Sequence, residues 1–427
     1  MLGPRPRFRF YGMPRGYFVA LKAFLTGRVS RGDDVAKLER DLESRLDVSH
    51  AVAVSQARLG IYLAVKHLVP AGREVILSPY TIYDVVNMVI AAGAKPIFCD
   101  IDPVTCNIDF EKARDLITDR TAAILITHLH GLTAEPERFR ALCDERGLYL
   151  IEDSAQAYGA RAGSRRAGTI GHVGVFSFGR VKNVNAFFGG AVVTDDADLA
   201  AKMRAEVHGY PLQETSVLCK RVVNCLIADV ATMPGVFQLV TYWVFRYACL
   251  RNIESVNKIV DTEDHPVRRD EVPERYLRAM TPLQARLVLS QLDDVDRFMS
   301  QRLAHAARYA DELADLEFMQ LPPKRADGSH AYLVFPVQVR DRWDFVKHMM
   351  RHGCDLSIQH YNNTADLKCF EDVARDCPAA RRVAQRVVLL PTYPSFGMDQ
   401  VARVIDVARR YTPEPKTHGV EQTPSVS

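Results

Sequence analysis

The chain has 427 residues, of which 48% are hydrophobic and 25% charged, the balance of a soluble globular protein rather than a disordered one. Its 55 basic and 52 acidic side chains leave a net charge of +3, which gives no reason to expect nucleic-acid binding. The length suits one large domain and a smaller one, and it excludes a disulfide-stapled miniature.

Nine cysteines are scattered along the chain, and no two of them form a CxxC pair. This spacing gives no support to a zinc finger or a thioredoxin-type site, and no metal site is predicted. The odd number of cysteines, with a start that lacks a signal-peptide pattern, favours reduced thiols in the cytoplasm.

Residues 1–30 form an N-terminal segment with an amphipathic helix expected around Tyr17–Leu25. Over residues 31–215, short apolar runs then alternate with helix-length segments. The runs are AVAVS, EVILSPY, PIFCDID, AAILITHLHG, LYLIEDSA, VGVFSFG and GAVVT. Runs that are apolar on both faces predict a buried parallel sheet covered by helices. The pattern therefore predicts an α/β doubly wound domain of about seven strands.

Residues 216–265 contain an apolar insert, in which the stretch 222–250 carries only two charged side chains, Asp229 and Arg246. Pro234–Gly235 lies in its middle, so we expect two apolar helices joined by a turn. Each half is too short to span a bilayer.

Residues 266–411 show a long helical pattern from Thr281 to Asp315, a strand AYLVFPVQV, a helix ending at Gly353 and a final helix from Met398 to Tyr411. This order predicts a small α+β domain. Residues 412–427 are polar and are expected to be a disordered tail.

Two residues at predicted strand ends suggest a chemistry. Asp153 ends a buried strand, where a carboxylate is costly unless it meets a cation, and Lys182 follows another strand end. A partly desolvated lysine can attack a carbonyl, and an acid can hold a pyridine nitrogen protonated. A pyridoxal phosphate enzyme needs both groups. The pair alone is more often a salt bridge.

The surrounding motifs resemble the DegT/DnrJ/EryC1/StrS family of sugar aminotransferases. The resemblance rests on SPYTIYDVVNMVIAAGAKPIFCDID, EDSAQAYGA and FSFGRVKNVNAFFGG, with MTPLQARLVLSQLDDVDRF and VVLLPTYPSFGMDQV further on. It implies the aspartate-aminotransferase fold (fold type I), with a large domain built on a mostly parallel seven-stranded sheet and a small C-terminal α+β domain. It also implies pyridoxal 5′-phosphate as cofactor and a homodimer with shared active sites.

The resemblance assigns roles to single residues. Lys182 would hold the cofactor covalently and act as the catalytic base and acid, and Asp153 would pair with the pyridine nitrogen. Gln156 would lie near the phenolic oxygen and Ser177 on the phosphate. The helix that starts after Ser55 would offer its N-terminus to the same phosphate.

Four positions depart from the family pattern. Ala57–Arg58 replaces a Gly-Thr pair, so Arg58 is expected to grip the phosphate. Ile82 stands where an aromatic residue usually stacks on the cofactor ring, and Tyr80 and Tyr83 are alternative stacking residues. Phe187–Phe188 makes the loop after Lys182 more apolar. Arg278 is expected to replace an asparagine that the partner subunit lends to the phosphate.

Two histidine-containing motifs remain, THLHG and SIQHYNN. His128 and His130 are expected to be structural, and the pair His360–Tyr361 is a further candidate for lining a substrate pocket.

The predicted function is transfer of an amino group from glutamate to a keto-sugar, expected to be nucleotide-linked, in polysaccharide, lipopolysaccharide or antibiotic sugar biosynthesis. A dehydratase of the same fold would carry histidine in place of Lys182. A regulatory protein of this fold is a further alternative. For the insert two alternatives stay open: packing at the dimer interface or over the active site, or contact with the inner membrane surface and a lipid-linked substrate.

Overall fold

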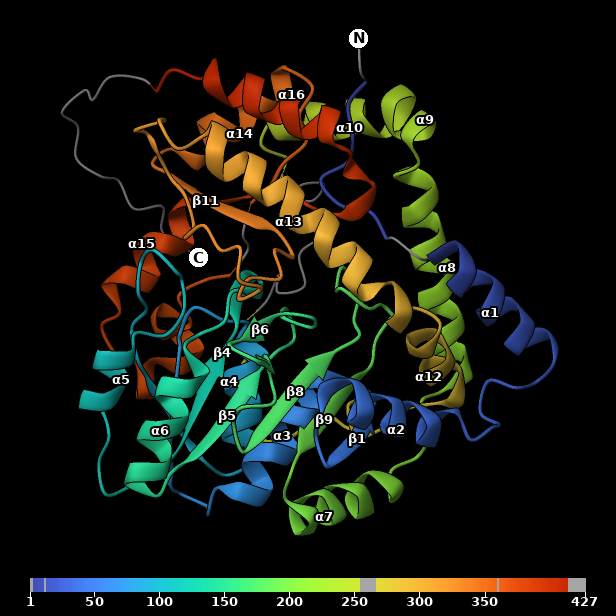
Figure 1. The fold of residues 1–427 in the computed structure, drawn as a ribbon, viewed down its shortest axis with the longest axis vertical. Helices are drawn as coiled ribbons and strands as arrows, with labels where there is room; N and C mark the ends of the chain where they lie inside the picture. Colours follow the sequence, from blue (N-terminus) through green and yellow to red (C-terminus); the bar gives the residue numbers. More distant parts are fainter. Residues whose placement is uncertain (1–2, 11–12, 254–265, 359–360, 414–427) are drawn as a thin grey trace.

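The computed structural model describes residues 3–10, 13–253, 266–358 and 361–413. Its main feature is a seven-stranded sheet in the order β1-β9-β8-β5-β4-β2-β3 (Figure 1). The strands are β1 (His50–Val54), β2 (Glu74–Leu77), β3 (Lys95–Phe98), β4 (Thr121–Thr127), β5 (Tyr149–Asp153), β8 (Val173–Ser177) and β9 (Gly190–Thr194). Only β9 runs antiparallel to its neighbours. The predicted mostly parallel sheet of seven strands is confirmed.

Helices cover both faces of this sheet because its strands are apolar on both faces. Val75 and Leu77 of β2 pack with α3 and α4, whereas Ile76 between them packs with α5 and α6. All seven residues of β4 are buried. The covering helices are α2 (Asp34–Leu46), α3 (Ala57–Leu68), α4 (Tyr83–Ala91), α5 (Phe110–Asp115), α6 (Pro136–Arg146) and α7 (Ala197–His208).

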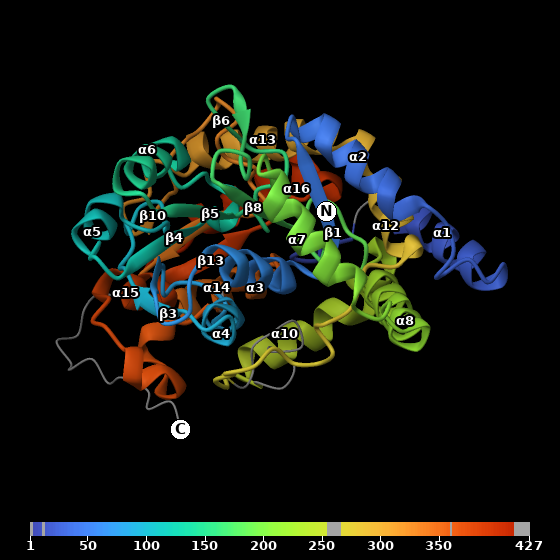
Figure 2. The ribbon, with the colours of Figure 1, turned by 90° about the horizontal axis from the view of Figure 1, so that it is seen from below.

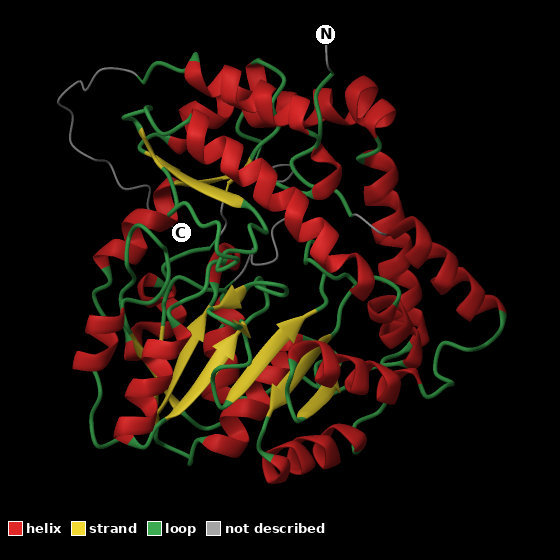
Figure 3. Cartoon of the chain, viewed as in Figure 1, coloured by secondary structure: helices red, strands yellow, loops and turns green. Residues whose placement is uncertain are grey.

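The C-terminal part contains a second, antiparallel sheet in the order β10-β11-β13-β12. Figure 3 shows it apart from the large sheet, among helices of its own. Its elements are β10 (Met319–Gln320), β11 (Phe335–Val339), β12 (Ser357–Ile358), β13 (Val387–Leu390), α13 (Val295–Glu312), α14 (Arg342–Arg351), α15 (Pro378–Arg386) and α16 (Met398–Arg409). The shorter elements are β6 (Arg161–Ala162), β7 (Arg165–Arg166), η1 (Leu129–Gly131), η4 (Thr364–Asp366), η5 (Lys368–Val373) and η6 (Pro394–Phe396).

Two expected elements differ in extent. The long helical pattern from Thr281 is divided into α12 (Pro282–Leu289), a 3₁₀ turn η3 (Leu292–Asp294) and α13. The expected nine-residue strand shortens to the five residues of β11. Tyr332, in the first half of that motif, adopts a left-handed φ of 42°, which is incompatible with an extended strand.

The apolar insert forms two helical segments, as expected. They are α8 (Thr215–Ala231) and a continuous helical run of α9 (Pro234–Val236), η2 (Phe237–Thr241) and α10 (Tyr242–Leu250). The expected turn at Pro234–Gly235 is wrong: Pro234 is the first residue of the second helix, where its missing N–H costs nothing. The break between the two helical segments lies just before Pro234, and their axes are bent by 61° there.

Figure 2 shows α8 beside α1 (Met13–Leu25) at one flank of the molecule. The helix α10 lies away from α1 and packs against α14 (Figure 1). In the described residues no single helix is long and apolar enough to cross a membrane. The domain boundaries at 215 and 265 stay predictions. Residues 254–265, His360 and most of the expected tail, 414–427, lie outside the described residues.

Candidate active site

The carboxyl ends of β1, β5 and β8 meet at one edge of the large sheet. Gly190 at the start of β9 pairs with Val54 on one side and with Ser177 on the other. On β5, the strand next to β8, Asp153 pairs with Val175, two residues before Ser177. The register thus brings Asp153, Ser177 and the segment after Val54 to the same edge, where ligands bind in open α/β sheets.

The first turn of α3 lies against this edge. A Cβ atom on Gly190 would stand 2.6 Å from the Phe176 carbonyl oxygen and 2.8 Å from the Ala57 nitrogen, so only glycine allows this approach. Backbone N–H groups in the first turn of a helix lack helical partners, and the helix dipole favours an anion there. Ala57 and Ser177 therefore flank a place suited to a phosphate.

Lys182 lies in the loop between β8 and β9, beside Val181, whose φ of 59° is unusual for a β-branched residue. Burial lowers the pKa of Lys182 to about 8; the Asp153 carboxylate opposes this shift and the Arg58 charge adds to it. A lysine with this pKa holds a substantial fraction of neutral amine near neutral pH, which makes it a competent nucleophile.

Asp153 is only 5% exposed, and its Oδ1 accepts the Ala155 N–H at 3.0 Å. Burial raises the pKa of its carboxyl group, against the lowering effects of that hydrogen bond and of the Lys182 charge. A buried carboxylate of this kind is stabilised by a cationic N–H partner.

The Gln156 side chain joins two elements. Its Oε1 accepts the His130 N–H at 2.9 Å, and its Nε2 donates to the Tyr361 hydroxyl at 2.8 Å. A carboxamide nitrogen carries two N–H groups, so Gln156 retains a second donor for a ligand. Tyr361, the described member of the His360–Tyr361 pair, thus does reach the residues of the predicted site.

The three stacking candidates occupy different environments. Tyr80 is 1% exposed and contacts His130 and Tyr361 edge-on, at ring-centroid distances of 6.4 and 6.0 Å. Ile82 is half-buried against the core beside α3 and α4, and Tyr83 is buried in that core. Which of them faces a cofactor ring stays a prediction.

Arg58 is held by two partners. It donates to Asp84 Oδ2 at 2.6 Å and to the Tyr276 hydroxyl at 3.0 Å. Its charge reaches Lys182, whose pKa it lowers, so it lies close to the predicted cofactor site. Arg278 forms ion pairs with Glu214 and Glu274 of its own chain, at 3.7 and 3.6 Å.

Sequence reasoning missed the buried Glu152–His128 pair behind the site. His128 Nδ1 accepts the Ala134 N–H, so Nε2 carries the proton and donates to Glu152 at 2.8 Å. Glu152 also accepts the N–H groups of Gly168, Ile170 and Gly171. These bonds support the expected structural role of His128. The acidic residue Glu152, directly before Asp153 in the sequence, was the feature from which the pair could have been suspected.

His130 is buried like His128, but neither of its ring nitrogens has a hydrogen-bond partner among the described residues. Burial lowers its pKa to about 3, so the ring is neutral at physiological pH. Its backbone, with a left-handed φ of 58°, presents the N–H to Gln156.

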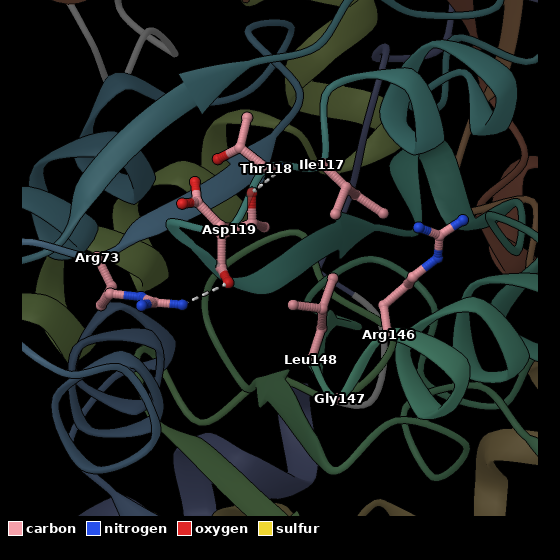
Figure 4. A pocket seen from close by; sticks show the side chains of 8 residues that line it. Arg73, Ile117, Thr118, Asp119, Arg146, Gly147 and Leu148 are labelled. Carbon is pink, nitrogen blue, oxygen red and sulfur yellow. Dashed lines mark hydrogen bonds between the residues drawn. The ribbon is translucent and has the colours of Figure 1, made fainter.

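A pocket of about 370 Å³ lies at the opposite edge of the sheet, away from these residues (Figure 4). Arg73, Thr121 and Leu148, at the amino ends of β2, β4 and β5, help to line it. It therefore has no part in the site described above. Among the described residues no group of three His, Cys, Asp or Glu side chains is arranged to hold a metal ion.

Comparison with known proteins identifies the class. The model of the DegT/DnrJ/EryC1/StrS aminotransferase family matches residues 19–240 and 268–409. The chain belongs to this family, whose members depend on pyridoxal phosphate, and it is an aminotransferase of that fold.

Three similar proteins illustrate the match. The spore coat polysaccharide biosynthesis protein SpsC of Bacillus subtilis is 28% identical, with coverage of 90% of this chain and 91% of that protein. The dTDP-3-amino-3,4,6-trideoxy-alpha-D-glucose transaminase of Micromonospora megalomicea is 29% identical, covering 91% and 92%. The structure of S. venezuelae DesV in complex with a ketimine intermediate superposes with a TM-score of 0.72 at 26% identity, covering 93% and 95%.

Proposed function

We propose that this chain transfers an amino group from glutamate to the keto group of a nucleotide-linked sugar, with pyridoxal phosphate held on Lys182. The observation that carries the proposal is the placement of a lysine of lowered pKa and a buried carboxylate, Asp153, in electrostatic contact at one sheet edge. An intact lysine at this position argues against the dehydratase alternative.

The donor set fits the cofactor. Asp153 would pair with the protonated pyridine nitrogen, and the first turn of α3 with Ser177 would bind the phosphate. The second N–H of Gln156 would meet the phenolic oxygen. Arg58 adds positive charge near the phosphate end, and Asp84 and Tyr276 fix its orientation.

Pyridoxal phosphate, when bound, supplies an electron sink for removal of a proton beside the amino nitrogen. The chain then has two tasks. The amine of Lys182 would take up that proton and return it to the cofactor carbon on the other side of the nitrogen, which a pKa of about 8 permits near neutral pH. The Asp153 carboxylate keeps the pyridine nitrogen protonated throughout.

Arginines near the site favour a phosphorylated substrate. Arg221 lies over the Phe188 ring at 3.9 Å, and its pKa is lowered by burial and by the charges of Arg180 and Arg58. Three guanidinium groups within mutual electrostatic reach attract a diphosphate anion. We therefore infer a nucleotide-linked sugar, in agreement with the name of the Micromonospora relative.

The proposed assembly is a homodimer in which Arg278 of each chain approaches the other chain's phosphate site. Its two ion pairs here, at 3.6 and 3.7 Å, are with side chains that are mostly exposed. Exposed ion pairs of this kind contribute little to the free energy of folding, so little stability is lost when Arg278 leaves them to bind a phosphate.

Product analysis tests the function. The purified protein with pyridoxal phosphate is incubated with glutamate and then with dTDP-, UDP- or GDP-linked 3- and 4-keto-sugars, and products are identified by mass spectrometry. We expect 2-oxoglutarate from the first step and an amino-sugar from at least one acceptor. The Lys182→Ala variant is the control without turnover. Release of 2-oxoglutarate without conversion of any nucleotide-linked acceptor would contradict the proposed substrate class.

A further inference from the structure

The outer surface of the apolar insert is unusual for a protein surface. On α8, four apolar side chains at helical spacing are 45–62% exposed: Val223, Leu226, Ile227 and Val230. The opposite side of the same helix buries Leu218 and Cys225 against the body of the protein. An ordinary surface helix is polar on its outer side, whereas α8 is apolar on both.

The second helical segment continues this pattern. Its outer stripe contains six apolar or aromatic side chains that are 38–79% exposed: Val236, Leu239, Val240, Trp243, Val244 and Tyr247. Its inner side packs Phe237, Tyr242 and Cys249 into the core of the C-terminal part. We call the two outer stripes together the insert face. Exposed apolar side chains gathered on one pair of helices in this way are typical of an interaction site.

Charge around the insert face is one-sided. Residues 215–253 contain four basic side chains and one acidic side chain, Asp229, which is buried. The neighbouring residues 1–31, which include α1 beside α8, contain seven basic and no acidic side chains. Because the whole chain carries only +3, the remainder of the chain is net acidic. Positive charge is therefore concentrated in the insert and in the N-terminal segment beside it.

We propose that the insert face docks the protein onto an anionic lipid bilayer without crossing it. Apolar side chains would enter the boundary of the acyl chains, Trp243 and Tyr247 would lie at headgroup level, and basic side chains such as Lys220 and Arg251 would meet anionic lipids. The inference goes beyond the transamination reaction, which needs no membrane.

The charge distribution favours a bilayer over a second copy of this chain as the occupant. Two insert faces brought together would oppose their concentrated positive charges, whereas anionic lipid neutralises them.

The two tryptophans of the chain allow a direct test with the full-length protein. Trp343→Phe leaves Trp243 on the insert face as the reporter, and Trp243→Phe leaves Trp343 on α14 as the matched control. With vesicles of phosphatidylcholine and phosphatidylglycerol, we expect a blue shift of emission and quenching by brominated lipid for Trp243 only. Vesicles of phosphatidylcholine alone should bind less, by about fivefold for each basic side chain engaged.

A second pair of variants tests the apolar contribution by vesicle flotation. The double change Leu239→Glu with Val240→Glu should lower the bound fraction at least tenfold, on the order expected for replacing two buried apolar side chains. Val104→Glu, at a similarly exposed apolar residue outside the insert face, should leave it unchanged. Absence of a Trp243 shift with anionic vesicles would overturn the proposal. The proposal would also be overturned if the wild-type protein did not float with vesicles and the double change instead split an oligomer into monomers.

Discussion

The Arg58 guanidinium donates to the Asp84 carboxylate at 2.6 Å, which ties the first turn of α3 to the first turn of α4. The Tyr276 hydroxyl donates to the same Asp84 oxygen at 2.9 Å. Arg58 is thus oriented by a buried acid, and its charge lowers the pKa of Lys182. This relationship makes the proposed role of Arg58 at the predicted cofactor site testable.

Arg58→Ala should weaken pyridoxal phosphate binding by about tenfold, because one charge-assisted contact near the phosphate is lost. It should also lower the melting temperature, since Asp84 loses its closest cation. Titration of the apoprotein with the cofactor measures the first effect and thermal unfolding the second. Tyr276→Phe is the control: it removes a hydrogen bond to Asp84 but no charge. Equal cofactor affinity in Arg58→Ala and the wild type would contradict the role of Arg58.

Neighbouring acids on β5 should respond in opposite ways. Asp153→Asn should lower the transamination rate by about a hundredfold or more, because an amide does not keep the pyridine nitrogen protonated. It should not lower the stability of the apoprotein, because burial raises the pKa of Asp153 and so disfavours its ionised form.

Glu152→Gln should instead lower the free energy of unfolding by about 2–3 kcal/mol, since Glu152 accepts bonds from His128 and from three backbone N–H groups. Its rate per folded molecule should stay within a few-fold of the wild type. Kinetics and denaturant unfolding of both variants give the comparison. If the Glu152→Gln variant were as slow as Asp153→Asn, the assignment of the catalytic role to Asp153 alone would be wrong.

The pKa of Lys182 predicts a pH dependence of apoprotein stability. In the folded chain this pKa is lowered to about 8, against 10.5 for the ordinary lysine of the unfolded chain. Between these values the unfolded chain binds more protons, so stability rises with pH from about 8 to about 10.5. Lys182→Met should therefore be more stable than the wild-type apoprotein at pH 7, and the difference should shrink above pH 8. A difference in melting temperature that does not change with pH would contradict the lowered pKa.

Gly190→Ala should destabilise the protein by about 3 kcal/mol or more and weaken cofactor binding. Its Cβ would meet two backbone atoms, the Phe176 oxygen and the Ala57 nitrogen, which cannot move without shifting β8 or α3. Gly235→Ala is the matched control, because nothing lies within 4 Å of its Cβ and its helical position favours alanine by about 0.5–1 kcal/mol. Similar melting temperatures for the two variants would exclude a close approach at Gly190.

The large sheet was predictable because each strand is a short apolar run between turn residues, and buried parallel strands are apolar on both faces. Limits of elements were less predictable. Pro234 fits both a turn and the first position of a helix, and only packing places it in the helix. The left-handed Tyr332 that shortens β11 has no signal in its own sequence.

The positions of Asp153 and Ser177 at strand ends, and of Lys182 after one, were predictable because each follows a short apolar run; their roles in the site stay predictions. The Asp84 and Tyr276 partners of Arg58 were not predictable, because Tyr276 lies 218 residues away and meets Arg58 only in the folded chain. The exposure of the insert face was not predictable either, since an apolar helix pair has the same composition whether it is covered or exposed.

Borohydride trapping tests most directly whether Lys182 carries the pyridoxal phosphate. The protein purified with pyridoxal phosphate is reduced with borohydride before and after exposure to glutamate, digested and mapped by peptide mass spectrometry. We expect the pyridoxyl group on Lys182 before glutamate, its loss after glutamate, and a visible absorbance band that falls in parallel. A pyridoxyl group on another lysine, or none at all in a folded protein supplied with cofactor, would contradict the assignment of Lys182 and the proposed reaction.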